Sequence, residues 1–296
     1  MVRVLLLIFV LGGVLVMCSS AMAAPKVDVK DGVLPGGNLL ALETYSLREL
    51  FGKGELDMLT FPAKTKELHI KGLALNDMFF KSWDEAYLTQ IKDAAKAQGR
   101  VIVAFIMGGG LATGDEAARK KNIEEISRKM KVAHFLGAPV VRIDLGGTGQ
   151  GQEADDTVGV ERVIAGFKEL LPLAKQLKIK MTIENHGGVS KSADNILRII
   201  KGTDPKWVGS CLDFKNWPKD LFYESNEKLA PYAYHTHAKS HNFGPDGEET
   251  DISYQRVLAM LQKVHYKGPI SIEWEGGGDP IVGVEKTRDL IIKYWK

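Results

Sequence analysis

The amino-acid sequence predicts a single-domain (β/α)8 TIM barrel, and three observations support this fold class. Eight short runs rich in Val, Ile and Leu recur along the 296 residues, and longer segments with helical spacing separate them, as in parallel strands joined by crossover helices. No Pro-, Ser- or Gly-rich linker divides the chain, so residues 24–296 are expected to form one domain. No Gly-rich dinucleotide fingerprint follows the first strand, which argues against an open doubly wound sheet.

The elements follow one another in regular order. The predicted strands cover residues 39–45, 68–74, 101–107, 140–144, 180–185, 208–212, 232–238 and 270–275. The predicted helices cover residues 83–97, 115–136, 159–177, 192–201, 253–264 and 282–294. Two crossovers are less regular, because residues 55–67 contain Pro62 and residues 218–229 offer only a few turns.

Glycine clusters at residues 108–110 and 146–147 follow the third and fourth predicted strands. A phosphate-binding loop is one interpretation of such clusters. They lack the Lys and Ser/Thr of a P-loop, however, and this favours flexible substrate loops.

The first 23 residues are predicted to be a cleavable signal peptide. Arg3 supplies a positive region, residues 4–16 form an apolar run, and residues 21–23 are small enough for cleavage. A membrane anchor is the alternative, but the apolar run is shorter than the ~20 residues that span a bilayer. Lipid modification at Cys18 is a further alternative, which Met17 disfavours. We therefore expect an exported protein, periplasmic or secreted, that begins near Ala24.

Composition limits the partners of the mature chain. Once Cys18 is removed, Cys211 is its one cysteine, so no internal disulfide can form. The formal net charge is +2, and the Lys and Arg residues are spread among Asp and Glu, which favours neither nucleic acid nor acidic lipid. We expect a small-molecule partner and no stable membrane insertion after cleavage, and the sequence leaves a homo-oligomer open.

Ionisable side chains end the later predicted strands, where a TIM barrel places its active site. Because side chains alternate along a strand, residues two positions apart share one face. If those faces look into the barrel mouth, acidic and imidazole groups from four strands meet where water is scarce. The residues concerned are Glu184, His186, Asp213, His235, His237, Lys239, Glu273 and Glu275.

Two Glu, one Asp and one His at four consecutive strand ends predict one divalent metal. Unpaired charges are costly to bury, and a shared cation removes that cost. Oxygen ligands with one imidazole suit Mn²⁺, Mg²⁺, Co²⁺ or Zn²⁺ and do not distinguish among them. The alternative is that each acid pairs separately with a nearby Lys or Arg, which is harder to reconcile with four consecutive strand ends.

Over nearly all of its mature length the chain resembles the xylose-isomerase-like TIM-barrel family. This family includes sugar and sugar-phosphate isomerases, epimerases, hydroxypyruvate isomerase, inosose dehydratase and endonuclease IV. Each matching motif is weak alone, and their order and spacing together are fairly specific. The motifs are LETYS at 42–46, LGAPVVR at 136–142, IENHGG at 183–188, LDF at 212–214, HAK at 237–239 and IEW at 272–274.

The resemblance implies roles for individual residues. It places the metal ligands at Glu184, Asp213, His237 and Glu273, and it makes Glu184 and Glu273 the acid/base pair that moves a proton between adjacent carbons. A metal that polarises a carbonyl and a hydroxyl, with a carboxylate on either face, is consistent with this chemistry. His241 competes with His237 as the ligand of the seventh strand, and His237 is favoured.

The predicted substrate-binding residues are His186, Arg142, Lys239 and His241. The family resemblance supports His186 as a contact to substrate oxygens, but it could instead orient a metal ligand. Arg142 could instead pair with Asp144 at the barrel mouth. Lys239 could hold a substrate oxygen or steady a glutamate.

Some positions depart from the family pattern. Asn216 stands where many members have His, and Ser240 where many have Asp, which alters the surroundings of the metal or the substrate pocket. His235 is expected to pack deeper in the barrel. Endonuclease IV needs further zinc ligands from earlier strands, but His69 lies inside the second predicted strand and His134 within a helix.

The sequence therefore predicts a metal-dependent isomerase or epimerase of a sugar or keto-sugar. A keto-sugar dehydratase or keto-glycoside lyase would use the same proton abstraction and stays open. A non-catalytic sugar-binding barrel is the other alternative, and the two glutamates argue against it.

Overall fold

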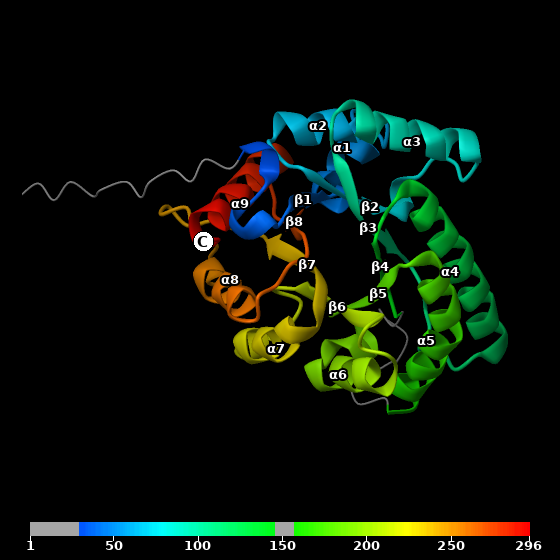
Figure 1. The fold of residues 1–296 in the computed structure, drawn as a ribbon. Helices are drawn as coiled ribbons and strands as arrows, with labels where there is room; N and C mark the ends of the chain where they lie inside the picture. The colour runs from blue at the N-terminus through cyan, green and yellow to red at the C-terminus, as the bar shows by residue number, and fades with distance from the viewer. Residues whose placement is uncertain (1–29, 146–156) are drawn as a thin grey trace, which may run out of the picture.

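The computed structural model describes residues 30–145 and 157–296, which form a closed barrel of eight parallel strands. Each strand pairs with the next in sequence, and β8 pairs with β1, so that this part of the chain forms a closed sheet. Helices surround the strands (Figure 1). The predicted α/β barrel is confirmed. The predicted signal peptide and the glycines at 146–147 lie outside the described residues.

The strands have four to eight residues, and the described helices range from five residues in α1 to 21 in α4 and α5. The strands are β1 (Leu40–Glu43), β2 (Gly72–Asn76), β3 (Val101–Met107), β4 (Val140–Ile143), β5 (Lys180–Glu184), β6 (Val208–Asp213), β7 (Ala233–Ser240) and β8 (Ile270–Trp274). The helices are α1 (Arg48–Gly52), α2 (Phe61–Glu67), α3 (Glu85–Ala97), α4 (Glu116–Leu136), α5 (Thr157–Leu177), α6 (Ala193–Gly202), α7 (Phe222–Leu229), α8 (Tyr254–Lys263) and α9 (Pro280–Tyr294). None of the described helices is both long and apolar enough to span a bilayer.

The second strand was predicted to begin at Leu68, and this is wrong by four residues. Leu68 is the C-cap of α2, directly after its last residue, and His69 adopts a left-handed φ of 56° that turns the chain. The apolar residues Leu68 and Ile70, on either side of this turn, are buried in the main apolar cluster. β2 begins at Gly72, where a Cβ would lie 2.6 Å from the Cβ of Ala41, so strands β1 and β2 approach closely there.

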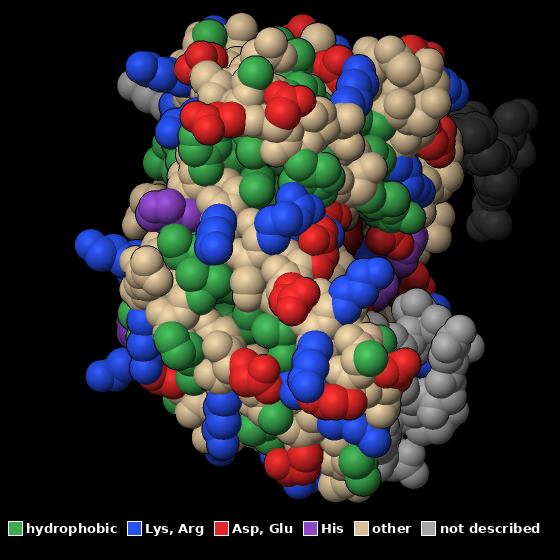
Figure 2. All heavy atoms as spheres, turned by 90° about the vertical axis from the view of Figure 1, so that its right-hand side faces the viewer, with side chains coloured by type: hydrophobic (Ala, Val, Ile, Leu, Met, Phe, Trp, Pro, Cys, Tyr) green, Lys and Arg blue, Asp and Glu red, His purple; other side chains and the backbone are tan. Residues whose placement is uncertain are grey.

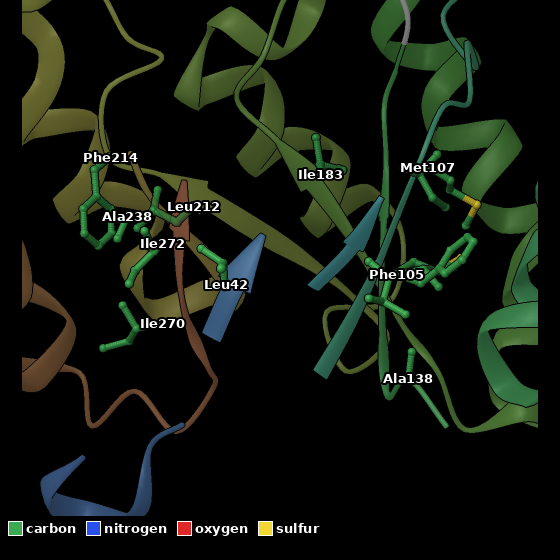
Figure 3. Close-up of a cluster of buried hydrophobic side chains, with 14 of the residues drawn as sticks. Leu42, Phe105, Met107, Ala138, Ile183, Leu212, Phe214, Ala238, Ile270 and Ile272 are labelled. Atoms are coloured by element: carbon green, nitrogen blue, oxygen red, sulfur yellow. The ribbon is translucent and has the colours of Figure 1, made fainter. Parts of the chain in front are cut away.

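Most of the core lies between the strands and the surrounding helices. Large apolar side chains on the outer faces of the strands pack there against the helices. Figure 3 shows members of this layer, among them Leu42 on β1, Phe105 on β3 and Ile272 on β8. A second, smaller apolar cluster is separate from this layer and consists of Ala41, Ala74, Val103, Ala104, Ile106 and Val140.

This small cluster fills one half of the barrel interior. Ala41 stands two residues before Glu43 on β1, and Val140 stands two residues before Arg142 on β4, so each pair shares an inward face. The polar residues above the cluster therefore lie at the carboxyl ends of the strands. This is the end at which TIM barrels carry their active sites.

Candidate active site

The carboxyl ends of β5 to β8 bring four predicted ligands together. Glu184, Asp213, His237 and Glu273 each offer one ligand atom, and these atoms lie within 4.8 Å of one another. Strand register explains the meeting, because Asp213 is paired with His237 across β6 and β7. Side-chain alternation then puts all four on the inward face. All four are buried. We call these residues the four-residue cluster.

The members of the cluster contact one another closely, and one ring nitrogen of the histidine is left without a hydrogen bond within the described part of the chain. His237 Nδ1 lies 2.8 Å from Glu184 Oε1 and 3.4 Å from Glu273 Oε2. The buried Asp213 Oδ2 and Glu273 Oε2 have the ammonium of Lys239 as an ion-pair partner, whereas the buried His237 Nε2 has no hydrogen-bond acceptor or donor oxygen or nitrogen among the described residues. Buried polar atoms normally have a partner. Carboxylate oxygens with one imidazole nitrogen are suitable donors for a divalent cation, so the residues present fit a metal.

The two glutamates of the cluster have opposite pKa shifts. Burial disfavours the charged form of Glu184, but Arg142 and His237 outweigh this effect and hold its pKa well below the ordinary value. For Glu273, burial dominates and raises the pKa well above the ordinary value, although Lys239 and His237 oppose the shift. The protein environment alone thus favours the ionised form of Glu184 and the protonated form of Glu273. Carboxyl groups whose pKa values are pushed apart in this way are found in acid/base pairs.

Lys239 joins the cluster to its surroundings. Its Nζ lies 3.0 Å from Asp213 Oδ2, 3.2 Å from Glu273 Oε2 and 3.0 Å from Glu275 Oε1. It is buried, and despite burial these carboxylates raise its pKa well above the ordinary value. Glu275 is half-buried, yet His241 and Lys239 outweigh its burial and lower its pKa to about 2. Lys239 therefore holds a fixed positive charge beside two members of the cluster.

Arg142 is engaged by acidic groups. Its Nε and Nη2 both lie 2.5 Å from Glu184 Oε2, and Nη2 lies 3.2 Å from Asp144 Oδ2. His186 Nδ1 lies 3.0 Å from Asp144 Oδ2, and this hydrogen bond raises the pKa of His186. The Asp144 pairing considered for Arg142 is present, together with a closer one to Glu184. The imidazole of His186 is more open, with its side chain 39% exposed.

His241 lies outside the four-residue cluster. Its Nε2 is 3.7 Å from Glu275 Oε2, and its backbone N–H donates to Glu249 Oε1 at 3.2 Å. It also belongs to a second group with Glu249 and Asp251, whose carboxylates bind Lys215. His241 thus lies at the edge of the site, where the carboxylate of Glu275 stands between it and Lys239.

Glu43 was not among the site residues predicted from the sequence. This residue ends β1, which closes the barrel beside β8, and its Oε2 accepts a hydrogen bond from the backbone N–H of Tyr45 at 2.5 Å. Burial raises its pKa to about 7, with His237 opposing the shift. The signal was available, because Glu43 follows an apolar run as the other strand-end acids do.

A further buried group lies deeper in the same half of the barrel. Cys211, His235 and His237 also have ligand-type atoms within 4.8 Å of one another. Both ring nitrogens of His235 lack hydrogen-bond partners among the described residues, and burial lowers its pKa well below the ordinary value. His235 is therefore neutral and packs below the cluster.

This barrel with a buried acidic cluster at its carboxyl end matches a known family. The model of the xylose isomerase-like TIM barrel matches residues 62–294, and the chain therefore belongs to that family. The solved structure of 3-keto-D-glucoside 4-epimerase, YcjR, from E. coli has a TM-score of 0.65 and 14% identity, covering 78% of this chain and 92% of that one. Other matching solved structures are also sugar epimerases.

Two further proteins are similar to this chain. A xylose isomerase-like TIM barrel protein from Mycobacterium smegmatis, solved in complex with magnesium, has a TM-score of 0.63 and 18% identity, covering 88% of this chain and 92% of that one. The probable endonuclease 4 of Methanoculleus marisnigri is 31% identical over 108 residues, which are 34% of this chain. The chain thus spans 37% of the length of this curated relative.

The histidines considered for an endonuclease site lie elsewhere. His69 is in the turn before β2, and His134 is in α4, where its Nδ1 contacts the backbone oxygen of Leu177 at 3.1 Å. On the face shown in Figure 2, Lys and Arg side chains are interspersed with Asp and Glu. That face therefore carries no continuous positive patch of the kind that binds nucleic acid.

Proposed function

We propose that the protein is a divalent-metal-dependent isomerase or epimerase of a sugar or keto-sugar. The observation that carries this proposal is the convergence of Glu184, Asp213, His237 and Glu273 within 4.8 Å of one another at the carboxyl ends of β5 to β8. Membership of a family whose structural neighbours include sugar epimerases supports the same substrate class. The metal would be Mn²⁺, Mg²⁺, Co²⁺ or Zn²⁺.

In this proposal the four-residue cluster holds the cation. When bound, the cation polarises the substrate carbonyl and the neighbouring hydroxyl, and so acidifies the adjacent C–H. Glu184 and Glu273 are the proton-transferring residues: one carboxylate removes the proton from carbon, and the other returns a proton. Because the two side chains come from strands on different sides of the cluster, they can approach a bound sugar from two directions.

The surrounding residues position the substrate and these carboxylates. Arg142 neutralises and orients Glu184 through its 2.5 Å contacts, so its proposed effect on substrate is through that glutamate. Lys239 steadies Glu273 and presents positive charge to a substrate oxygen. His186 lies at the open side with its imidazole held by Asp144, and His241 lies at the far edge beside Glu275. In this proposal both hydrogen-bond substrate hydroxyls.

Isotope exchange tests the proposed chemistry. The purified protein is incubated with Mn²⁺ and a panel of keto-sugars in D₂O, and deuterium incorporation at carbon is followed by NMR. We expect incorporation for at least one keto-sugar, and its loss when the metal is removed by a chelator. Absence of exchange across a broad panel, with the metal bound, contradicts the proposed reaction. Elimination products in place of an epimer or isomer would identify a lyase.

Metal content tests the proposed ligands separately. We expect Asp213→Asn to lower the bound metal measured by elemental analysis, because Asp213 offers one of the four converging ligand atoms. Asp220→Asn makes the same chemical change at an exposed residue and is the matched control. Equal metal content in both variants would contradict the ligand assignment.

We also propose that residues 1–23 direct export and are then removed. The apolar run and the small residues at 21–23 support this proposal. Expression of the full chain in a bacterial host should yield a periplasmic or secreted protein whose measured mass corresponds to a start near Ala24. A protein that retains Met1 and stays in the cytoplasmic fraction would contradict it.

A further inference from the structure

Below the four-residue cluster, the barrel interior holds a second set of ligand-type side chains. Cys211, His235 and His237 each offer one sulfur or nitrogen atom, and these atoms lie within 4.8 Å of one another. All three residues are buried. Strand register explains the meeting, because Cys211 is paired with His235 across β6 and β7, and His237 lies two residues further along the same inward face. We call these residues the thiol–imidazole group.

His235 gives independent evidence that this group binds a ligand. Its side chain is fully buried, and neither of its ring nitrogens forms a hydrogen bond among the described residues. Burying polar atoms without partners costs free energy, and nearly all buried polar atoms in proteins have one. Imidazole is also the commonest metal ligand among protein side chains. The burial of His235 is therefore explained if a cation lies between it and its two neighbours.

His237 belongs to both groups, and its two ring nitrogens have different surroundings. Nδ1 faces the four-residue cluster, where it lies 2.8 Å from Glu184 Oε1 and 3.4 Å from Glu273 Oε2. Nε2 is buried and has no hydrogen-bonding oxygen or nitrogen in the described part of the chain. Nδ1 is therefore the nitrogen available to the four-residue cluster, and Nε2 is the nitrogen available to the thiol–imidazole group.

The donor atoms of the thiol–imidazole group favour a thiophilic cation. Hard cations such as Mg²⁺ and Mn²⁺ prefer carboxylate oxygens, which the four-residue cluster supplies. One thiolate and two imidazoles form the ligand set of protein copper sites, and soft thiolate ligands also select Cu⁺ and Zn²⁺. The two groups therefore differ in the class of cation that each one suits.

Charge and ligand number favour Cu⁺ over Zn²⁺ in this group. Structural Zn²⁺ is almost always bound by four ligands, whereas the group offers three. With a single thiolate, Zn²⁺ would also leave a net positive charge in the barrel interior, and burying such a charge is costly. Cu⁺ and one thiolate together are neutral, so this cost does not arise.

We propose that Cys211, His235 and Nε2 of His237 form a buried Cu⁺ site, and that Cu⁺ bound there opposes divalent-cation binding at the four-residue cluster. The thiol of Cys211 releases its proton to solvent when Cu⁺ binds, because the thiolate is the form that binds a metal. The Cu⁺ site itself is independent of the proposed function. Its opposition to the divalent cation rests on the proposed role of His237 as a ligand.

The opposition follows from the chemistry of the imidazole ring. A neutral imidazole has one nitrogen with a free lone pair and one nitrogen that carries a proton. When Nε2 of His237 binds Cu⁺, Nδ1 carries the proton and donates a hydrogen bond to Glu184 Oε1, 2.8 Å away. Nδ1 then has no lone pair for a second cation. Cu⁺ in the thiol–imidazole group thus removes one of the four ligands of the divalent cation.

Copper content tests the site directly. The full chain is expressed in copper-supplemented medium, so that Cu⁺ can enter as the chain folds, and chelator-treated protein is titrated with Cu⁺ under anaerobic conditions. We expect about one Cu⁺ per chain by elemental analysis, with sulfur and nitrogen ligands in X-ray absorption spectra. Absence of copper by both routes, or copper without a sulfur ligand, would overturn the proposal.

Variants show whether the copper is bound by the thiol–imidazole group. We expect Cys211→Ser and His235→Leu each to weaken Cu⁺ binding by about 100-fold or more, since loss of a residue that only orients a ligand already costs about 10–100-fold. Cys18→Ser makes the same change at the other cysteine of the chain, and His134→Leu makes it at an exposed histidine of α4. If the variants of the group bind Cu⁺ as tightly as these controls, the assignment is wrong.

Titration with Mn²⁺ tests the opposition and separates its failure from failure of the proposed function. Free Mn²⁺ is measured by electron paramagnetic resonance with and without one equivalent of Cu⁺. We expect Cu⁺ to weaken Mn²⁺ binding by about tenfold or more in the wild type and to have no effect in Cys211→Ser, which keeps the four-residue cluster. Unchanged Mn²⁺ affinity with Cu⁺ bound would overturn the opposition. If Cu⁺ binds through Cys211 but Mn²⁺ never binds, the Cu⁺ site holds and the divalent-metal assignment is wrong.

Discussion

The two halves of the barrel interior are built from different kinds of residue. In the half formed by β1 to β4, the layer below the mouth consists of small and branched apolar side chains, such as Ala41, Ala74 and Val140. In the half formed by β5 to β8, the corresponding positions hold polar residues, among them Thr182, His235 and Ser271. The backbone hydrogen bonds and the closed topology are the same on both sides.

This difference suggests that one half of the barrel stabilises the fold and the other half carries out the proposed chemistry. Apolar side chains gain free energy when they leave water, whereas buried polar groups cost free energy unless they find partners. In the polar half, His235 and Ser271 have side-chain atoms without hydrogen bonds among the described residues. We infer that the β1–β4 half contributes mainly to folding, and that the β5–β8 half retains costly groups because they form the proposed site.

The largest expected effect is on activity, in the polar half. Glu273→Gln removes a proposed proton-transferring carboxylate and should reduce deuterium exchange by about 10²- to 10⁴-fold. Gln keeps the size and polarity of the side chain, so thermal unfolding should change little. An active Glu273→Gln variant would show that Glu273 transfers no proton.

The next effect is on stability, in the apolar half. Ile106→Ala leaves a cavity in the inner apolar cluster and should lower the free energy of unfolding by about 2–5 kcal/mol. Denaturant titration measures this loss. Metal content should stay the same, because Ile106 offers no ligand atom. Loss of metal without loss of stability would contradict the assignment of folding to this half.

In the metal-free protein, substitution of His235 is expected to have a smaller effect on stability, and one of opposite sign. Leu is similar in size to His and has no buried nitrogen to satisfy, so His235→Leu should raise the free energy of unfolding by about 1 kcal/mol. The measurement is the denaturation midpoint at constant m-value. A loss of stability would show that the imidazole has a partner in solution and that the polar half is less costly than inferred.

The smallest effect concerns an ion pair at the opposite end of the barrel from the site. Asp31 contacts Lys71 and Arg100, whose hydrogen bonds lower its pKa below the ordinary value. Its side chain is 47% exposed, so water and salt screen the contacts, and Asp31→Asn should cost about 0.2–1 kcal/mol at pH 7.

The dependence of this effect on pH follows from the direction of the shift. A carboxyl group whose pKa is lowered in the folded state contributes its full stability above its unfolded pKa, about 3.9, and loses it as the pH falls through the lower folded value. The free energies of unfolding of the wild type and of Asp31→Asn, measured by denaturant titration, should therefore differ at pH 6 and become equal in strong acid. A difference that grows on acidification would contradict the ion-pair explanation.

Much of the architecture could be predicted because it depends on local patterns. The third predicted strand coincides with β3, and helical spacing placed α4 within one residue of its observed bounds. The start of β2 was misplaced because Leu68 and Ile70 are as apolar as strand residues. They flank a left-handed residue, His69, and are buried in the core, and composition does not distinguish buried turn residues from buried strand residues.

The sequence by itself determined the alternation of strands and helices, and it determined that ligand-type side chains stand at the ends of β5 to β8. Side-chain alternation, a property of each strand alone, was sufficient for that. Tertiary structure decided the rest. Barrel closure placed Glu43 of β1 beside β8, and strand register brought Arg142 against Glu184. These contacts join residues far apart in sequence, and their distances depend on how the whole barrel closes.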